Sequence, residues 1–184
     1  MTLVHDLARP APARTPYTEV RFAKLLDGAL IVHGQMAWLG GDRLERSVTG
    51  PGAETINIDG NHATLQRAGQ PALQLPLDRA PGLKDLLGSF VALLSGDAAA
   101  LARSFELQAY GNDQAWTLEL QPRAAQVRQH IRAITVDGSD RQMRCMRVDS
   151  TSGATTFTLL GALADARLPA APTPAQMVRL CAGP

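Results

Sequence analysis

The sequence predicts a mainly β fold, in which a curled antiparallel sheet is covered on its open side by a helical lid. Most of the chain consists of short segments in which apolar and polar residues alternate, separated by glycine-containing turns. The main stretch of helical periodicity lies in the middle of the chain, at about residues 82–104. Because so little helix cannot cover a flat sheet, we expect the sheet to curl over itself.

Composition and charge restrict the class of protein. The 184 residues suit one domain, and 18 basic residues against 17 acidic ones leave a formal net charge of +1. Nucleic-acid-binding proteins usually carry a basic excess, so no nucleic-acid partner is expected. No apolar run approaches the roughly 20 residues of a membrane-spanning helix, so no transmembrane segment is expected.

Residues 1–16 predict a helical turn followed by a proline-rich connector. Leu3, Val4 and Leu7 have weak helical spacing, whereas the segment 9–16 is rich in proline and shows no periodicity. The stretch lacks the continuous apolar core of a secretion signal, which taken alone indicates the cytoplasm. A Met placed before an already trimmed mature chain gives the same pattern, so both locations stay open at this point.

Short strands are predicted before the helical region. Asp27-Gly28 predicts a hairpin turn between the first two. In the second strand Gly34 interrupts a row of apolar residues, which predicts a bulge or a close approach of another chain segment. The predicted strands are 17–26, 29–39, 43–48, 54–59, 63–67 and 73–77.

Two helices and a second run of strands follow. Leu87, Phe90 and Leu94 recur at three- and four-residue spacing, which predicts an amphipathic helix, and Asp97 suits the N-cap of the next one. With turns expected at Gly138 and Gly153, the domain ends near residue 167. The predicted helices are 81–94 and 98–104, the strands are 106–110, 115–121, 131–137, 142–148 and 155–160, and the tail 168–184 has one helical turn at 175–180.

The low aromatic content limits how much of the sheet's interior the side chains can fill. Aromatic residues make up 4% of a chain that is 45% hydrophobic, so a curled sheet has few large side chains to fill its interior. We therefore expect an apolar cavity that takes an apolar ligand, with an ordinary packed β core as the alternative. The candidate lining residues are Leu30, Val32, Met36, Trp38, Ile56, Ile58, Leu65, Leu75, Leu87, Phe90, Leu94, Trp116 and Leu118.

Signatures of catalysis are missing from the pattern of residues. No serine has the flanking glycines of a nucleophile elbow, no Walker loop is present, and the four histidines are scattered without metal-ligand spacing. We expect no enzyme, no catalytic residues, no cofactor and no metal site. Cys145 and Cys181 form a disulfide in an oxidising compartment or remain free thiols in a reducing one, and the sequence leaves both open.

The order of several soft motifs resembles the LolA-like family of periplasmic outer-membrane lipoprotein carriers. The front motifs are Tyr17-Thr-Glu-Val-Arg-Phe, Gly34-Gln-Met-Ala-Trp-Leu, Asp42-Arg-Leu-Glu-Arg and Glu54-Thr-Ile-Asn-Ile-Asp-Gly60. The later Leu94-Ser-Gly-Asp97, Phe105 and Trp116-Thr-Leu-Glu-Leu-Gln-Pro122 resemble a smaller branch that accompanies aryl-polyene or xanthomonadin-type pigment clusters. The resemblance covers about Thr18 to Leu160, and its weight comes from order and spacing.

The resemblance implies an unclosed (half) β-barrel whose helical lid covers an apolar cavity. It implies a monomeric, non-enzymatic carrier in the periplasm, with the signal peptide already removed from this chain. Its cargo would be the acyl or polyenyl chain of a lipid or lipoprotein, received from an inner-membrane donor and delivered to an outer-membrane acceptor.

One departure and one alternative qualify this expectation. Where the family pattern has an Arg-Pro pair in the third strand, this chain has Gly41-Asp42, with Arg43 one place further on. A lipid or polyene ester is therefore expected as cargo rather than a lipoprotein. The alternative function is a protein-interaction or assembly module of a lipid or pigment biosynthesis system, with a packed core and a docking β edge.

Overall fold

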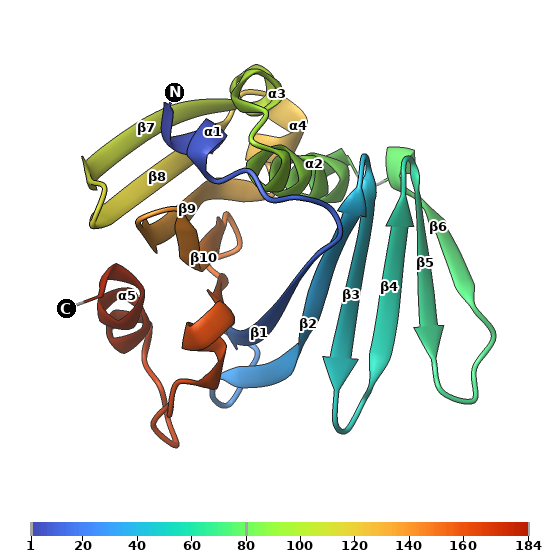
Figure 1. The fold of residues 1–184 in the computed structure, drawn as a ribbon. Coiled ribbons are helices and arrows are strands. Elements are labelled where there is room, and N and C mark those ends of the chain that lie inside the picture. The colour runs from blue at the N-terminus through green and yellow to red at the C-terminus, as the bar shows by residue number, and fades with distance from the viewer. Residues whose placement is uncertain (1, 80, 184) are drawn as a thin grey trace.

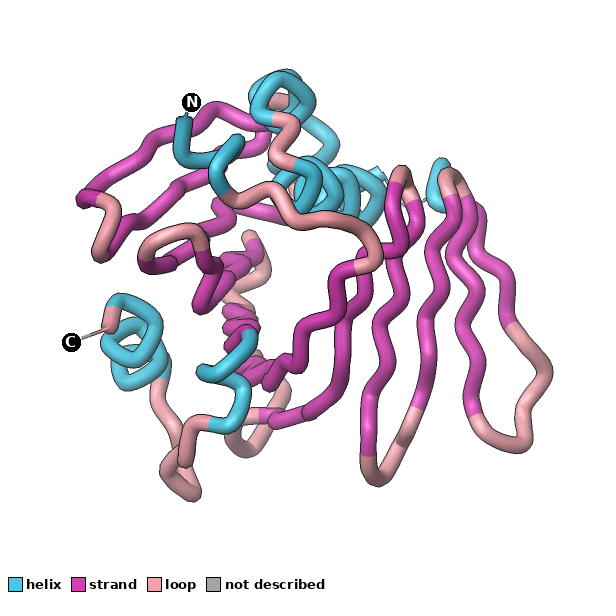
Figure 2. Tube along the Cα trace, in the orientation of Figure 1, coloured by secondary structure: helices cyan, strands magenta, loops and turns pink. Residues whose placement is uncertain are grey.

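The computed structural model describes residues 2–79 and 81–183 and contains one eleven-stranded antiparallel sheet (Figures 1 and 2). The strands run in the order β6-β5-β4-β3-β2-β1-β11-β10-β9-β8-β7. Because β6 and β7 lie at opposite edges, the sheet is not closed, and the predicted half-barrel fold class is confirmed. The strands are β1 (Ala13–Phe22), β2 (Leu30–Gly40), β3 (Arg43–Thr49), β4 (Glu54–Asp59), β5 (His62–Arg67), β6 (Leu73–Pro76), β7 (Phe105–Asn112), β8 (Ala115–Pro122), β9 (Ile131–Ser139), β10 (Gln142–Ser150) and β11 (Thr155–Leu160).

Helices lie on both faces of the curled sheet. The helices are α1 (Thr2–Asp6), α2 (Pro81–Ser95), α3 (Ala98–Ser104), α4 (Ala125–Arg128) and α5 (Pro174–Ala182), with 3-10 turns at Leu77–Arg79 and Gly161–Asp165. In Figure 1, α1 to α4 gather on the concave side, where α2 crosses the sheet, and α5 lies on the opposite side. The two predicted central helices are confirmed, and α4 and both 3-10 turns were not predicted.

The main core fills the concave side of β7 to β10. Phe105, Leu120 and Ile134 are completely buried there, and Leu93 of α2 and Leu101 of α3 pack against them. Asp97 caps α3 by accepting a hydrogen bond from the backbone N–H of Ala100 at 2.8 Å, as its position predicted.

The N-terminal segment is more ordered than the predicted connector. Val4 and Leu7 are buried in the main core, and β1 begins at Ala13 rather than at Tyr17. Between Ala13 and Pro16 the strand pairs only with β2, because pairing with β11 begins at Tyr17. A proline is tolerated along such an open edge, where its missing N–H leaves no ladder bond unmade.

A second core covers the convex side of the central strands. Val20, Phe157 and Leu159 form it with Met177 of α5, so the tail is part of the fold. The Cys145–Cys181 disulfide, with a Cα–Cα distance of 5.3 Å, ties α5 to β10, which decides the question that the sequence left open. The predicted helical turn is a nine-residue helix.

Gly138 does not make the turn predicted for it. It lies inside β9 opposite Trp116, and a Cβ atom on Gly138 would stand 2.1 Å from the indole ring. The turn comes two residues later at Asp140, which has a positive φ of 51°. The glycine therefore provides room for Trp116, whose ring N–H donates to the carbonyl of Asp140 at 2.9 Å.

Candidate functional site

The concave face carries every strand residue predicted to line the cavity. Directly opposed residues of neighbouring strands point to the same face of a sheet. The pairing Met36–Arg46–Ile56–Leu65 therefore identifies one face across β2 to β5. These registers, continued through β1, β11, β10 and β9 to β8, place on it Leu30, Val32, Met36, Trp38, Ile56, Ile58, Leu65, Leu75, Trp116 and Leu118.

Helix α2 covers the apolar concave face of β2 to β6 only in part. Ile58 and Leu77 are buried in a small cluster, and Leu87 of α2 packs against it. Further out on the same face Leu73 is exposed, and Leu75 is 42% exposed. The apolar concave surface of this half of the sheet thus remains accessible to solvent.

The remaining predicted lining residues lie in the main core on β7 to β10 or at the border of this core. Trp116 and Leu118 are buried in the main core, with Phe90 packed against it, and Leu94 is partly buried. A groove of about 160 Å³ lies beside Trp116 and Tyr110. A second, of about 360 Å³, is lined by residues of α2 and α3 together with Asp42: Asp42, Gly88, Val91, Ala92, Asp97, Ala100, Arg103 and Ser104.

The start of α2 is tied to the β4–β5 turn. The backbone N–H of Leu77 donates to the carbonyl of Asn61 at 2.8 Å. The Asp78 carboxylate accepts hydrogen bonds from Lys84 at 2.9 Å and from the Asn61 amide. The hydrogen bond from Lys84 is the main reason that the pKa of Asp78 lies below its usual value. These contacts fix the end of the helix nearest to β6.

Gly34 allows an aromatic ring to cross the floor of the site. A Cβ atom on Gly34 would lie 1.8 Å from the Ser47 carbonyl oxygen and 2.9 Å from Cε1 of Tyr17. The pairing of β1 with β2 is continuous at this point, so the predicted feature is a close approach and not a bulge. The Tyr17 hydroxyl reaches across β2 and donates to the Ser47 carbonyl at 3.2 Å.

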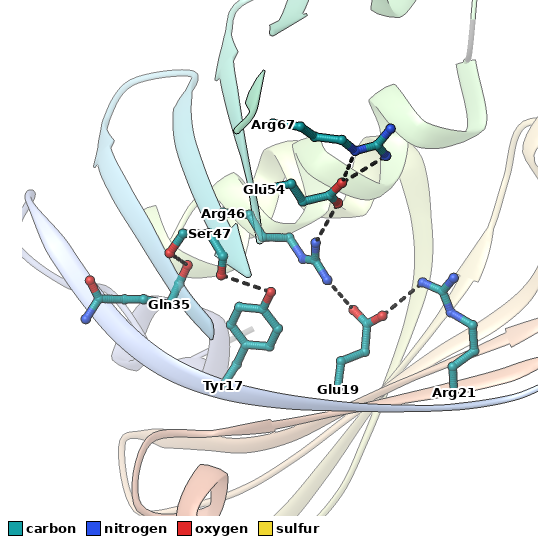
Figure 3. Close-up of polar contacts among 8 residues, drawn as sticks. All are labelled: Tyr17, Glu19, Arg21, Gln35, Arg46, Ser47, Glu54 and Arg67. Atoms are coloured by element: carbon teal, nitrogen blue, oxygen red, sulfur yellow. Dashed lines mark hydrogen bonds and ion pairs between the residues drawn. The ribbon is translucent and has the colours of Figure 1, made fainter. Parts of the chain in front are cut away.

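A chain of charged side chains, which we call the charged belt, crosses the same concave face (Figure 3). Glu19 accepts from Arg21 at 2.9 Å and from Arg46 at 3.1 Å. Arg46 also lies 3.9 Å from Glu54, and Arg67 approaches Glu54 to 2.9 Å. The belt is defined as Arg21, Glu19, Arg46, Glu54 and Arg67, and it alternates in charge across β1, β3, β4 and β5.

The middle of the belt is shielded from water and its two ends are open. Glu19 and Arg46 are mostly covered, whereas the side chains of Arg21 and Arg67 are 48% and 51% exposed. The guanidinium of Arg46 lies 5.1 Å from the centre of the Tyr17 ring, a cation–π arrangement. The belt has one more guanidinium than carboxylates, so it carries a net positive charge within a largely apolar face.

Burial raises the pKa of Tyr17 to about 12, against the lowering effect of the Arg46 charge. The folded protein favours the neutral phenol of Tyr17. The resulting contribution to the free energy of unfolding is therefore fully present below pH 10 and is lost as the pH rises from 10 to about 12. An ultraviolet absorbance titration should therefore show a late tyrosinate step, and Tyr17→Phe should remove it. A titration of Tyr17→Phe that keeps the step near pH 12 contradicts this assignment.

The charged belt was not predicted, although the sequence contains a signal for it. Arg46 alternates with Leu44 and Val48, and Glu54 precedes Ile56 on the same face of its strand. A charged residue at an apolar position of a one-sided strand indicates a polar site on the inner face.

Two requirements, those of a metal site and of a membrane-spanning helix, are not met within the described residues. Among them, no group of three or more histidine, cysteine, aspartate or glutamate side chains is placed to hold a metal ion. Across the same described ranges, no helix has the length and apolar character needed to cross a membrane.

Several solved structures are similar to this chain at low sequence identity. A LolA superfamily protein from Nitrosomonas europaea is 10% identical, with 91% of this chain and 92% of that chain covered and a TM-score of 0.49. A lipoprotein-sorting protein domain from Vibrio parahaemolyticus is 10% identical, with 86% and 87% covered and a TM-score of 0.45. LprF from Mycobacterium bovis is 12% identical, with 94% and 95% covered and a TM-score of 0.41.

The sequence matches a family model but no curated protein sequence. The search of curated protein sequences produced no match. The family described as "Outer membrane lipoprotein carrier protein LolA-like" matches residues 2–184, which is nearly the whole chain. The chain therefore belongs to the LolA-like family of outer-membrane lipoprotein carrier proteins.

Proposed function

We propose that this protein is a non-enzymatic periplasmic carrier that shelters the acyl or polyenyl chain of a lipid on the concave face beneath α2. The observation that carries the proposal is the accessible apolar surface of β2 to β6, where Leu73 and Leu75 face the lid side without being covered. Apolar surface on a monomer usually marks a binding site, and each buried CH₂ of a ligand contributes about 0.8 kcal/mol. Membership of the carrier family supports this proposal.

The proposed cycle needs no catalytic step. A chain received from an inner-membrane donor is held against the concave face, and movement of α2 exposes it to an outer-membrane acceptor. The pigment-cluster branch suggested by the sequence motifs makes a polyenyl ester one candidate cargo. The absence of the family's Arg-Pro pair before Arg43 favours such a lipid over a lipoprotein.

The test is binding of a neutral apolar dye, N-phenyl-1-naphthylamine, and its displacement by dodecanol. Leu75→Glu places a charge on the accessible apolar surface and should weaken dye binding by about tenfold or more. Val178→Glu is the matched control, because Val178 is 41% exposed on α5, on the opposite side of the sheet. Absence of dye binding in the unaltered protein, or an equal loss in both variants, contradicts the proposal.

A protein-interaction module remains a second candidate because of strand β6. It forms one edge of the sheet, and two exposed leucines, Leu73 and Leu75, lie on it. Such an edge can accept a strand of another chain. Binding of a partner protein that Leu75→Glu weakens, without any dye binding by the unaltered protein, would favour this function over the carrier.

A further inference from the structure

We propose that the charged belt binds the acidic head group, a carboxylate or a phosphate, of an amphiphile whose chain lies on the concave face. This inference rests on the proposed carrier function and adds to it the chemical class of the cargo. The belt is the polar end of the site, and the apolar surface beneath α2 is its other end.

The two ends of the site follow from the strand registers. Ala13 pairs with Trp38 in the row of residues that α2 covers, whereas Glu19 pairs with Val32 further along the same two strands. From Ala13 to Glu19 the strand runs about 20 Å, at roughly 3.3 Å per residue. The row at the lid end is therefore apolar, whereas the far end carries the charges of Glu19 and Arg21 beside Val32 and Leu30, an arrangement that suits an extended amphiphile.

The belt has donors left for a ligand. Arg21 contacts Glu19 through a single nitrogen, Nη2, and about half of its side chain is exposed. A guanidinium carries five N–H donors in a fork that suits carboxylate and phosphate oxygens. Arg67 is equally exposed at the other end of the belt. A ligand anion can therefore bind at either of the two open arginines, which lie at opposite ends of the belt, without displacing Arg46 from its two partners.

The charge balance favours an anion over a neutral or cationic group. The belt has three guanidiniums and two carboxylates, so one positive charge is unmatched. The partly desolvated surroundings of Glu19 and Arg46 strengthen the attraction of a counter-charge compared with bulk water. Tyr17 stays neutral beside Arg46 and so contributes no competing negative charge.

The experiment compares ligands that share one chain and differ in the head group. Dodecanoate, dodecyl phosphate and dodecanol are each used to displace N-phenyl-1-naphthylamine at neutral pH and low salt. The unaltered protein should prefer at least one of the two acids over dodecanol by about tenfold. The acid that is preferred more strongly identifies the head group as carboxylate or phosphate.

Variants of the belt test whether the arginines cause this preference. Arg21→Gln combined with Arg67→Gln should reduce it to within about twofold and leave dodecanol binding unchanged. Glu54→Gln removes a competing carboxylate and should increase it. Arg14→Gln is the matched control, because Arg14 is 52% exposed and pairs with Glu45 at 3.3 Å on the convex face. This control should keep the full preference.

The outcomes separate this inference from the proposed function. If the dye and all three ligands fail to bind the unaltered protein, the carrier function itself is overturned. If all three ligands bind equally well, or the acid preference survives in the double glutamine variant, the head-group inference is overturned and the carrier function stands. If Glu54→Gln lowers the acid preference, the belt acts only as a structural ion-pair network, which also overturns the inference.

Discussion

Breaking the Cys145–Cys181 disulfide is expected to lower the free energy of unfolding by about 4 kcal/mol. The bond closes a loop with a sequence separation of 36 residues, and the chain-entropy model gives about 4 kcal/mol for a loop of this size. Because Cys181 lies on α5, the broken bond also frees the helix from β10, so that only the packing of Met177 and its neighbours holds it.

Urea unfolding of the oxidised and the reduced protein measures this effect on one sequence. The reduced protein should unfold at a clearly lower urea concentration. A Cys145→Ala/Cys181→Ala variant serves as the control, because its unfolding should not respond to the reductant. Coincident curves for the oxidised and the reduced protein would falsify the stabilising role assigned to the bond.

Truncating Leu118 is expected to destabilise the protein far more than truncating Leu75. Leu118 is 3% exposed in the packed core, so Leu118→Ala leaves a cavity and should cost about 2–5 kcal/mol. Leu75 is 42% exposed on the same face of the sheet, so Leu75→Ala removes little packing and should cost less than about 1 kcal/mol. Urea unfolding of both variants checks the difference.

Dye binding by these two variants should show the reverse order. Leu75→Ala removes part of the accessible apolar surface and should weaken binding of N-phenyl-1-naphthylamine, whereas folded Leu118→Ala should bind it nearly as well as the unaltered protein. Equal stability losses would mean that both halves of the concave face are packed alike. That result would remove the main support for a binding surface on β2 to β6.

Where the sequence has clear start and stop signals for a helix or strand, the predicted first and last residues agree with the structure. The strand Glu54–Asp59 alternates without exception and ends at Gly60-Asn61, and the structure has the same bounds. The helix Ala98–Ser104 follows an Asp that caps it, and the strand Thr155–Leu160 follows the turn at Gly153. In these places, local chemistry determines the structure, so a single sequence is sufficient.

The errors come from features that depend on distant parts of the chain. Pro16 favours a connector when only its neighbours are considered, but β2 pairs with this segment and β11 does not reach it. The belt joins Glu19 of β1 to Arg46 of β3, two strands that are not neighbours in the sheet. Gly34 of β2, between them, carries no side chain to fill the space. Neither arrangement can be predicted until the strand order is known.

The pairing of β1 with β11 has a consequence for how the chain folds. Tyr17 pairs with Leu160, so the central hydrogen-bonded pair of the sheet joins the two most distant strands in sequence. The strands β2 to β6 and β7 to β10 each form meanders of local contacts, which close quickly, whereas long-range pairing is slow because the loop-closure entropy must be overcome first. We therefore expect the β1–β11 pairing to form late in folding, and with it the concave surface that the two halves of the sheet share.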